Sequence, residues 1–159
     1  MKQKIIQAFI AYFEQELAAL IQSAKAAHLA ATHEESRAED RHDTFAIEAS
    51  YLAAGQAVRV QDIRASIDEL NYFLSHLNAK PDSSVEIGSL VTLQTQGKKT
   101  LSLIARFGGG TTVTCEGTII SLVSPTSPLG DAMLGLSVGE EVTLESRAGT
   151  RNHEILDIE

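Results

Sequence analysis

The stretch SPTSPLGDAMLGLSVGEEV, at positions 124–142, has the densest turn chemistry in this chain. Its Ser-Pro and Pro-Leu-Gly steps interrupt regular backbone structure, and glycines alternate with Leu129, Met133 and Leu136. We expect an ordered turn, then a short helical segment, and then a strand that begins near Glu140. The stretch therefore indicates a compact, β-rich unit, although as a pattern alone it also fits a well-packed loop of any small β domain.

The composition limits the class of protein. The 159 residues suit one ordinary domain or two small ones, and 43% hydrophobic residues are enough to form a core. The net charge of -8 argues against a general nucleic-acid binder, so we expect no independent DNA binding. The single cysteine, Cys115, is typical of a cytoplasmic protein. No apolar run approaches the ~18 residues of a membrane span, and no signal-peptide pattern is present, so we expect no membrane segment.

Glycine and proline divide the chain into two halves. Residues 1–79 contain only Gly55 and no proline, whereas the other ten glycines and all 3 prolines follow Lys80. Because both residue types interrupt helices, this change in composition indicates a domain boundary. We expect a helical unit at 1–79, a linker at 80–84 and a mostly β unit at 85–159.

Two seams of residues in the first half have the spacing of a coiled coil. They advance by three or four residues at a time, at Ile6, Ile10, Phe13, Leu17, Leu20, Ala24, Ala27 and Ala31, and at Ala46, Ala49, Ala53, Gln56, Val60, Ile63, Ile67, Leu70, Leu74 and Leu77. Two such helices are expected to fold back on each other as an antiparallel hairpin. Pairing the seams places the tip at about 33–44, with its apex near 39–41. Because both seams shrink to alanine toward this tip, we expect the helices to approach closely there.

The predicted tip is rich in acidic residues. Glu39, Asp40 and Asp43 lie at the apex or just after it. One interpretation is that they only favour the dipole of the second helix, by about 0.3–1 kcal/mol each. The other is that carboxylates on a probe help to hold a divalent cation in the active site of another protein. His33 and His42 are a weak sign of a transition-metal site, since no cysteine or fixed-spacing histidine pair accompanies them.

The second half has the alternation of short strands. We expect strands at 85–94, 100–107, 111–115, 118–123, 141–145 and 152–158, separated by turns that contain glycine. The triple glycine at 108–110 is not a phosphate-binding loop, because no Lys-Ser/Thr follows it and it does not open a helix.

Nearly the whole chain resembles the Gre-type (GreA/GreB) transcript cleavage factors of bacterial RNA polymerase. The features that carry the resemblance are the acidic-tipped hairpin, ASYLAA at 49–54, SPLGDAMLG at 127–135 and GEEV at 139–142. The resemblance implies an α+β fold, in which an N-terminal antiparallel coiled-coil hairpin is followed by a small FKBP-like antiparallel β domain. It also implies an accessory transcription elongation factor that stimulates the nuclease activity of the polymerase and is not itself an enzyme.

The same resemblance implies where the factor binds. The β domain is expected to dock at the rim of the secondary channel of RNA polymerase, with the hairpin inserted into the channel. Ser127, Pro128, Leu129 and Gly130 match the family signature and are expected to help seat the β domain on the polymerase. No catalytic residue of its own is implied by the resemblance.

The expected chemistry belongs to the tip. The resemblance implies that Glu39, Asp40 and Asp43 share Mg²⁺ with the polymerase active site and so promote cleavage of backtracked RNA. Glu48 and Tyr51 are expected to support the tip. The factor is expected to meet the RNA 3′ end only within the polymerase.

The tip departs from the family pattern, which is Asp-x-x-Glu-Asn-Ala-x-Tyr. Aligned without gaps on Tyr51, this chain has Thr44 and Ile47 at the positions of the two acids, and Glu48 at the position of the asparagine. A one-residue insertion would bring Asp43 to the first acidic position. The alternative is therefore a non-cleaving regulator that occupies the secondary channel.

Two other classes are more distant. A structural adaptor hairpin would join partners without any chemistry at its tip, and so would tolerate changes of charge there. A prolyl isomerase would follow from the FKBP-like resemblance. However, such sites are lined by aromatic side chains, and Phe107 is the only aromatic residue in the second half.

Overall fold

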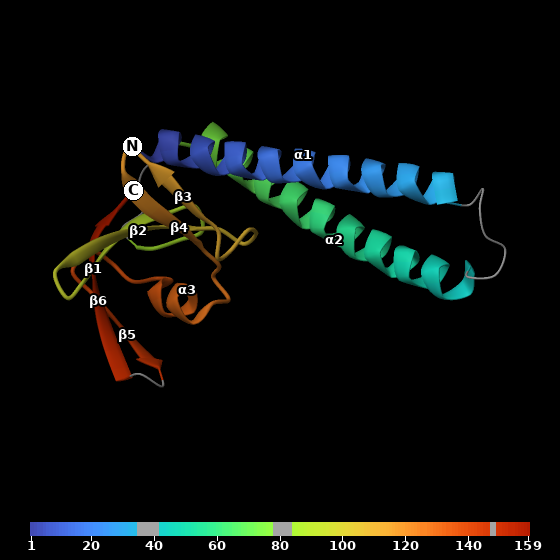
Figure 1. The fold of residues 1–159 in the computed structure, drawn as a ribbon. Helices are drawn as coiled ribbons and strands as arrows, with labels where there is room; N and C mark the ends of the chain where they lie inside the picture. Colours follow the sequence, from blue (N-terminus) through green and yellow to red (C-terminus); the bar gives the residue numbers. More distant parts are fainter. Residues whose placement is uncertain (35–41, 78–83, 147–148) are drawn as a thin grey trace.

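The computed structural model of this protein describes residues 1–34, 42–77, 84–146 and 149–159 (Figure 1). Between residues 27 and 54, the structure describes only the backbone of the two long helices, up to Glu34 and from His42.

Two long helices form the N-terminal half. Helix α1 (Lys2–Glu34) has 33 residues and leads away from the β domain, and helix α2 (His42–Ser75) has 34 and returns toward it (Figure 1). Both are rich in alanine and also contain leucine, glutamate and glutamine, all of which are strong helix formers. The predicted antiparallel hairpin is confirmed. Neither helix is long and apolar enough to cross a membrane, and the same holds for the rest of the described chain.

The hairpin is packed tightly at the end that meets the β domain. Ile6 and Phe13 on α1 and Ile63 on α2 are at most 1% exposed, as their seam positions predict. Ile5 and Phe9 lie outside the predicted seam but are equally buried. They are buried because α1 has a second covered face, which packs against the sheet and contacts β3.

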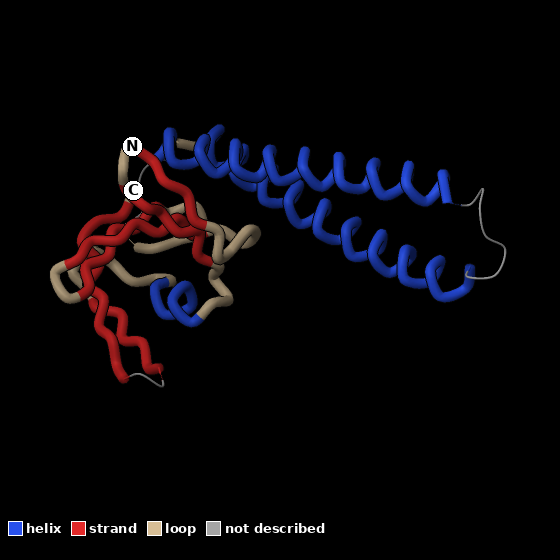
Figure 2. The backbone as a smooth tube through the Cα atoms, in the orientation of Figure 1, coloured by secondary structure: helices blue, strands red, loops and turns tan. Residues whose placement is uncertain are grey.

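Toward their connection, the two helices draw apart (Figure 2). Residues 21–26 of α1 are all exposed, and these include the seam residue Ala24 and the large side chain of Ile21. The expected close approach near the tip is therefore wrong. Pairing alanines removes little apolar area from water, so this part of the seam contributes little free energy to hold the helices together.

The second half forms one six-stranded sheet. Its strands are β1 (Leu90–Thr95), β2 (Lys98–Ile104), β3 (Thr112–Cys115), β4 (Thr118–Val123), β5 (Glu141–Ser146) and β6 (Gly149–Ile158). Their order across the sheet is β3-β4-β2-β1-β6-β5. Thus a small β domain follows the hairpin, as predicted.

One pair of neighbouring strands is parallel, so the sheet is mixed and not wholly antiparallel as expected. Strands β2 and β4 run in the same direction, with Leu103 opposite Leu122, and the other four pairs are antiparallel. The chain that leaves β2 first forms β3 at the edge of the sheet and then turns back as β4 beside β2. Glu116 and Gly117 make this turn with φ values of 50° and 79°, as in a tight type I′ hairpin.

The strand expected at 85–94 begins later than predicted. Ser84 makes only an isolated β-bridge with Ser137, and residues 86–89 form a turn, in which the backbone N–H of Glu86 donates to the hydroxyl of Ser89 (3.0 Å) and Gly88 has a φ of 96°. Val85 is nevertheless fully buried. The alternation of apolar residues thus reflects burial of this segment, although its backbone is not a strand.

Both faces of the centre of the sheet are covered. On one face, Leu103 and Ile120 pack against the base of the hairpin in a single hydrophobic cluster. On the other, Ile104 and Val123 pack beneath the short helix α3 (Pro128–Met133), whose Met133 is fully buried. The base of the hairpin, the sheet and α3 therefore form successive layers around two cores.

Candidate functional site

Residues 124–135, which we call the α3 corner, carry the chain from β4 into α3 and out of it again. Ser127 is the N-cap of α3: its hydroxyl accepts a hydrogen bond from the backbone N–H of Gly130 (3.1 Å) and donates one to the carbonyl oxygen of Ser124 (2.7 Å). Pro128 follows at the first helical position, where its missing N–H costs no helical hydrogen bond. The Ser-Pro step therefore starts the helix at this point.

Gly130 is required in the corner for steric reasons. A Cβ atom at this position would lie 2.0 Å from the carbonyl oxygen of Ser124 and 3.1 Å from the Cα of Pro125. Both neighbours are backbone atoms, so they cannot move aside as the end of a side chain can. Only glycine allows α3 to pack this closely against the preceding turn.

The four predicted docking residues lie together in this corner, but they differ in exposure. Gly130 is buried, Ser127 and Leu129 are half-buried, and Pro128 is exposed. Leu129 packs against the core cluster beneath α3. Of these four residues, Pro128 is therefore the exposed one, and the other three are at least partly buried within the fold. Their role in docking stays a prediction.

The predicted tip residues are described only in part. Glu39 and Asp40 lie outside the described residues. Asp43, Glu48 and Tyr51 belong to the first turns of α2, where the structure describes only the backbone. Elsewhere, in the parts of the chain with described side chains, no three histidine, cysteine or acidic residues are grouped closely enough to hold a metal ion. The ligand role of the tip acids and the supporting role of Glu48 and Tyr51 stay predictions.

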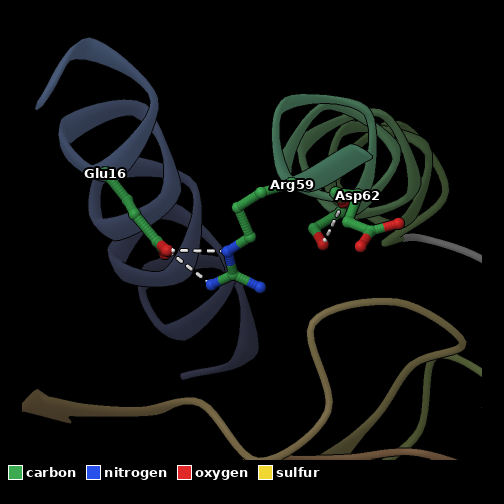
Figure 3. Close-up of polar contacts among 4 residues, drawn as sticks. Glu16, Arg59 and Asp62 are labelled. Atoms are coloured by element: carbon green, nitrogen blue, oxygen red, sulfur yellow. Dashed lines mark hydrogen bonds and ion pairs between the residues drawn. The ribbon is translucent and has the colours of Figure 1, made fainter. Parts of the chain in front are cut away.

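An ion pair joins the two helices outside the tightly packed base. The guanidinium group of Arg59 on α2 contacts Glu16 Oε1 on α1 through both Nε, at 3.0 Å, and a terminal nitrogen (Figure 3). Asp62, one turn further along α2, receives a hydrogen bond from Ser66 at its carbonyl oxygen (2.9 Å). Because half of the Arg59 side chain is exposed, the pair stabilises the hairpin only modestly.

A groove of about 920 Å³ lies between α2 and the β domain. We call it the α2 groove. Its walls include Tyr72 on α2, Phe107 after β2, and Leu134 of the α3 corner, which are 61%, 43% and 36% exposed. This groove was not predicted from the sequence. A usable signal was Tyr72 itself, an aromatic residue on α2 that lies outside the predicted seam.

Among the described residues that line the α2 groove, negative charges outnumber positive ones. These residues include Asp68, Glu69 and Glu86, and Arg106 is the one basic residue among them. One oxygen of Glu69 accepts a hydrogen bond from the backbone N–H of Phe107 (3.1 Å), which links α2 to the loop after β2. The other oxygen is buried and has no hydrogen-bond partner among the described residues. The carboxylate therefore adds negative potential at the wall of the groove.

Polar contacts also join the start of α1 to the β domain. The ammonium group of Lys4 lies 2.5 Å from Glu116 Oε1, and this hydrogen bond raises the pKa of Lys4 and lowers the pKa of Glu116. Lys2 donates to the carbonyl oxygen of Glu159 (2.8 Å), while burial lowers the pKa of the Lys2 ammonium group. The Lys4–Glu116 pair is largely exposed, so it adds little to the contact made by the hydrophobic core.

The second half of the chain shows to which family this protein belongs. Residues 80–159 match the family model described as transcription elongation factor, GreA/GreB, C-terminal. The chain belongs to the GreA/GreB family. In this member, the matched half contains the whole sheet and the α3 corner.

A curated relative points to the same family. The transcription elongation factor GreA of Syntrophus aciditrophicus (strain SB) is 47% identical over 36 residues. This match covers 23% of the present chain and 22% of the relative, so it spans less than a quarter of either Gre protein.

Three solved structures that are similar to this chain carry Gre-related names. The GreA factor homolog 1 (Gfh1) of Thermus thermophilus is 21% identical, with 96% of this chain and 95% of that chain covered and a TM-score of 0.38. Gfh1 of Thermus aquaticus is 22% identical over 96% and 94%, with a TM-score of 0.38. The GreA/GreB factor of Nitrosomonas europaea is 18% identical over 56% and 77%, with a TM-score of 0.37. The assignment to the Gre family rests on the match of residues 80–159 and not on these scores.

Proposed function

We propose that this protein docks on bacterial RNA polymerase through its β domain and inserts its hairpin into the secondary channel. The observation that carries the proposal is the match of the β domain to the GreA/GreB family, on a chain whose hairpin shares a hydrophobic core with that domain. Family members act on RNA polymerase. Because the hairpin is fixed to the β domain, docking of that domain would set the direction in which the hairpin points.

The dimensions of the hairpin support insertion into a channel. With 33 residues in α1 and a rise of 1.5 Å per residue, the helix is about 50 Å long. The hairpin is anchored by Phe9 and Phe13 of α1 and Leu70 of α2, which lie in the same hydrophobic cluster as residues of the sheet. A rod held at one end by such a core projects in a fixed direction, so docking of the β domain also sets the direction of the tip.

Within this proposal, the tip acids promote cleavage of backtracked RNA by the polymerase. Glu39, Asp40 and Asp43 carry carboxylate oxygens, which are the ligands that Mg²⁺ prefers. The ion, shared with the polymerase active site, would activate water for hydrolysis of the phosphodiester bond. The part played by this chain is to bring negatively charged ligands to the active site of the polymerase.

The second candidate function is regulation of transcription by channel occupancy without cleavage. The observation that favours it is the presence of Thr44 and Ile47 at the two positions where the family has acids, in the gap-free alignment on Tyr51. Neither side chain supplies a carboxylate ligand. In this case the hairpin would alter initiation or elongation by filling the channel.

RNA cleavage in a stalled, backtracked elongation complex separates the two functions. The wild type is compared with Asp43→Ala and with the double variant Glu39→Ala/Asp40→Ala. Glu14→Ala is the control, since Glu14 is an exposed acid of α1 far along the helix from the tip. If the protein is a cleavage factor, one or both tip variants lose cleavage activity and the control retains it. All four proteins should unfold at the same temperature.

The remaining outcomes select the other functions. Binding to the polymerase with no cleavage above that of the polymerase alone would reject the cleavage factor and leave the channel-occupying regulator. Absence of polymerase binding by the wild type would reject both functions. An adaptor hairpin would instead tolerate the changes of charge at its tip in every assay.

A further inference from the structure

Four polar side chains gather on one face of the sheet near the turn between β1 and β2. Lys98 on β2 lies opposite Thr95 on β1, and the hydroxyl of Thr95 contacts Nδ1 of His153 on β6 at 2.5 Å. Arg151 lies two residues before His153 on β6, so both side chains point to the same face. We call Thr95, Lys98, Arg151 and His153 the basic patch.

The strand register shows which face carries the basic patch. Leu93 and Ile155 lie opposite each other, and both are buried in the core beneath α3. Because side chains two residues apart on a strand share a face, Thr95 and His153 continue this face outward. Strands β5 and β6 extend past α3 (Figure 1), and both cations of the patch are exposed. The patch is therefore open to a ligand.

The alternation of side chains along the strands separates the charges by face. Glu141 and Glu154 lie opposite each other on the other face of the sheet, because their neighbours Val142 and Ile155 are buried beneath α3. In the described parts of β1, β2, β5 and β6, no position on the face of the patch is acidic. The net charge of -8, from which we expected no independent DNA binding, thus conceals a local positive surface.

The cations of the basic patch have no counter-ion in the fold. Neither Lys98 nor Arg151 forms an ion pair with the described residues. Burial lowers the pKa of His153, and the positive charge of Arg151 lowers it further, so these two groups are close in space. Cations that are held together without an acid create a positive potential that attracts an anion.

The spacing of the basic patch suits the phosphates of a nucleic-acid strand. Arg151 and His153 are about 7 Å apart along β6, and two strand spacings separate His153 from Lys98 by about 10 Å. A nucleic-acid strand carries one phosphate per about 3.4 Å of its axis, so the three side chains can each meet a different phosphate. Lysine, arginine and threonine are side chains that commonly contact phosphate oxygens.

A protein partner fits the basic patch less well. Interfaces between proteins usually have an apolar centre surrounded by a polar rim. In the described parts of β1, β2 and β6, no large hydrophobic side chain is exposed. A surface of hydrogen-bond donors without an apolar centre is typical of contact with a sugar-phosphate backbone.

We propose that the basic patch binds the sugar-phosphate backbone of a nucleic-acid strand, with Lys98 and Arg151 on different phosphates and the Thr95–His153 pair between them. The patch contacts phosphates and not base edges, so it does not select a sequence. The other charges of the chain repel the ligand, so the Kd is weak, on the order of 10⁻⁴ M. This inference goes beyond the proposed function and does not depend on it.

The test is an NMR titration of the full-length chain, without polymerase, with a short single-stranded DNA of mixed sequence at low salt. Lys98→Glu is paired with Lys99→Glu, because Lys99 follows in the chain but points to the opposite face. Arg151→Glu is paired with Arg64→Glu, since Arg64 is an exposed arginine of α2. All four substitutions change the net charge equally, so a difference between variant and control reports where the charge lies.

We expect the DNA to shift amide signals of the wild type mainly at the β1–β2 turn and along β6. Each patch variant should weaken binding about fivefold or more, and each control less than about twofold. Added salt should weaken binding by the wild type more than by the patch variants, because the variants contact fewer phosphates. All four variants should unfold close to the temperature of the wild type, since every altered side chain is exposed.

Three outcomes would overturn the inference. If the wild type shows no shifts at low salt, the patch does not bind nucleic acid. If the controls weaken binding as much as the patch variants, net charge and not the patch governs the contact. If a poly-glutamate peptide binds the same residues as tightly as the DNA, the ligand is an acidic protein segment. None of these outcomes bears on the proposed docking, because polymerase is absent from the assay.

Discussion

Gly130 is confined by the carbonyl oxygen of Ser124 and not by an unusual backbone conformation. Its position contrasts with that of Gly55 on α2, where an added Cβ would meet nothing within 4 Å. The same residue type is therefore essential at one site and a source of helix instability at the other.

Gly130→Ala is expected to lower the free energy of unfolding by on the order of 1–3 kcal/mol, because the new methyl group forces α3 away from the turn. Gly55→Ala is the control and should raise it by about 0.5–1 kcal/mol, since alanine is the better helix former. Urea unfolding followed by circular dichroism measures both changes. Equal stability of Gly130→Ala and the wild type would contradict the steric account.

Ser127→Ala should cost about 1 kcal/mol of stability, because the N–H of Gly130 loses its cap. Ser127→Thr keeps the hydroxyl and should retain most of that free energy. Urea unfolding again provides the measurement. If the two variants are destabilised equally, the hydroxyl is not the source of the effect.

His153 is expected to titrate below its usual range. Burial is the main reason why its pKa is lowered, and the nearby charge of Arg151 adds to the effect. Because the folded pKa is depressed, His153 contributes stability at pH values above its unfolded pKa, and this is lost as the pH falls through the folded pKa. NMR titration of the ring should show the low midpoint, and Arg151→Gln should raise it. A midpoint unaffected by folding would refute this reasoning.

At the scale of the elements, the hairpin depends on contacts near its base. Its seam residues are buried there, and the helices separate toward the connection, where the seam becomes alanine (Figure 1). The ion pair of Glu16 and Arg59 lies just outside the tightly packed part. It is therefore a candidate for holding the helices together beyond the core.

A double-mutant cycle with Glu16→Gln and Arg59→Gln should give a coupling free energy of about 0.2–1 kcal/mol, typical of a partly exposed pair. The coupling should shrink as salt is raised from 0.05 to about 0.5 M, because screening weakens exposed charges. Thermal unfolding of the four proteins yields the cycle. A coupling of zero at low salt would show that the pair does not hold the helices.

At the scale of the whole molecule, the hairpin and the β domain share one of the two cores. Phe9 from α1 lies in the same cluster as Leu103 and Ile120 from the sheet. Loss of packing in the hairpin should therefore also destabilise the β domain.

Phe9→Ala is expected to cost about 3–5 kcal/mol, the range for truncation of a buried phenylalanine. Amide hydrogen exchange should become faster in β2 and β4 as well as in α1 and α2, since all four meet at this cluster. Tyr12→Ala, on the same helix but exposed, should leave exchange in the sheet unchanged. Faster exchange confined to the helices would mean that the two parts fold independently.

The features predicted correctly from the sequence are those encoded by residues close together in the chain. The seam containing Ile6 and Phe13 specifies a helix with one apolar face, and Ser127-Pro128 specifies a helix start. Such signals depend on spacing and local turn chemistry. The same locality explains why most strands and the position of α3 were predicted.

Features that depend on distant contacts were not predictable in this way. The burial of Ile5 and Phe9 requires the sheet, and the parallel pairing of β2 with β4 requires β3 to occupy the edge. The α2 groove forms where Glu69 meets the backbone of Phe107, 38 residues away. Local sequence determines which segments become helices or strands. Which faces meet, and which side chains remain exposed between them, is decided by the packing of the assembled chain, because burial is a property of all the elements together.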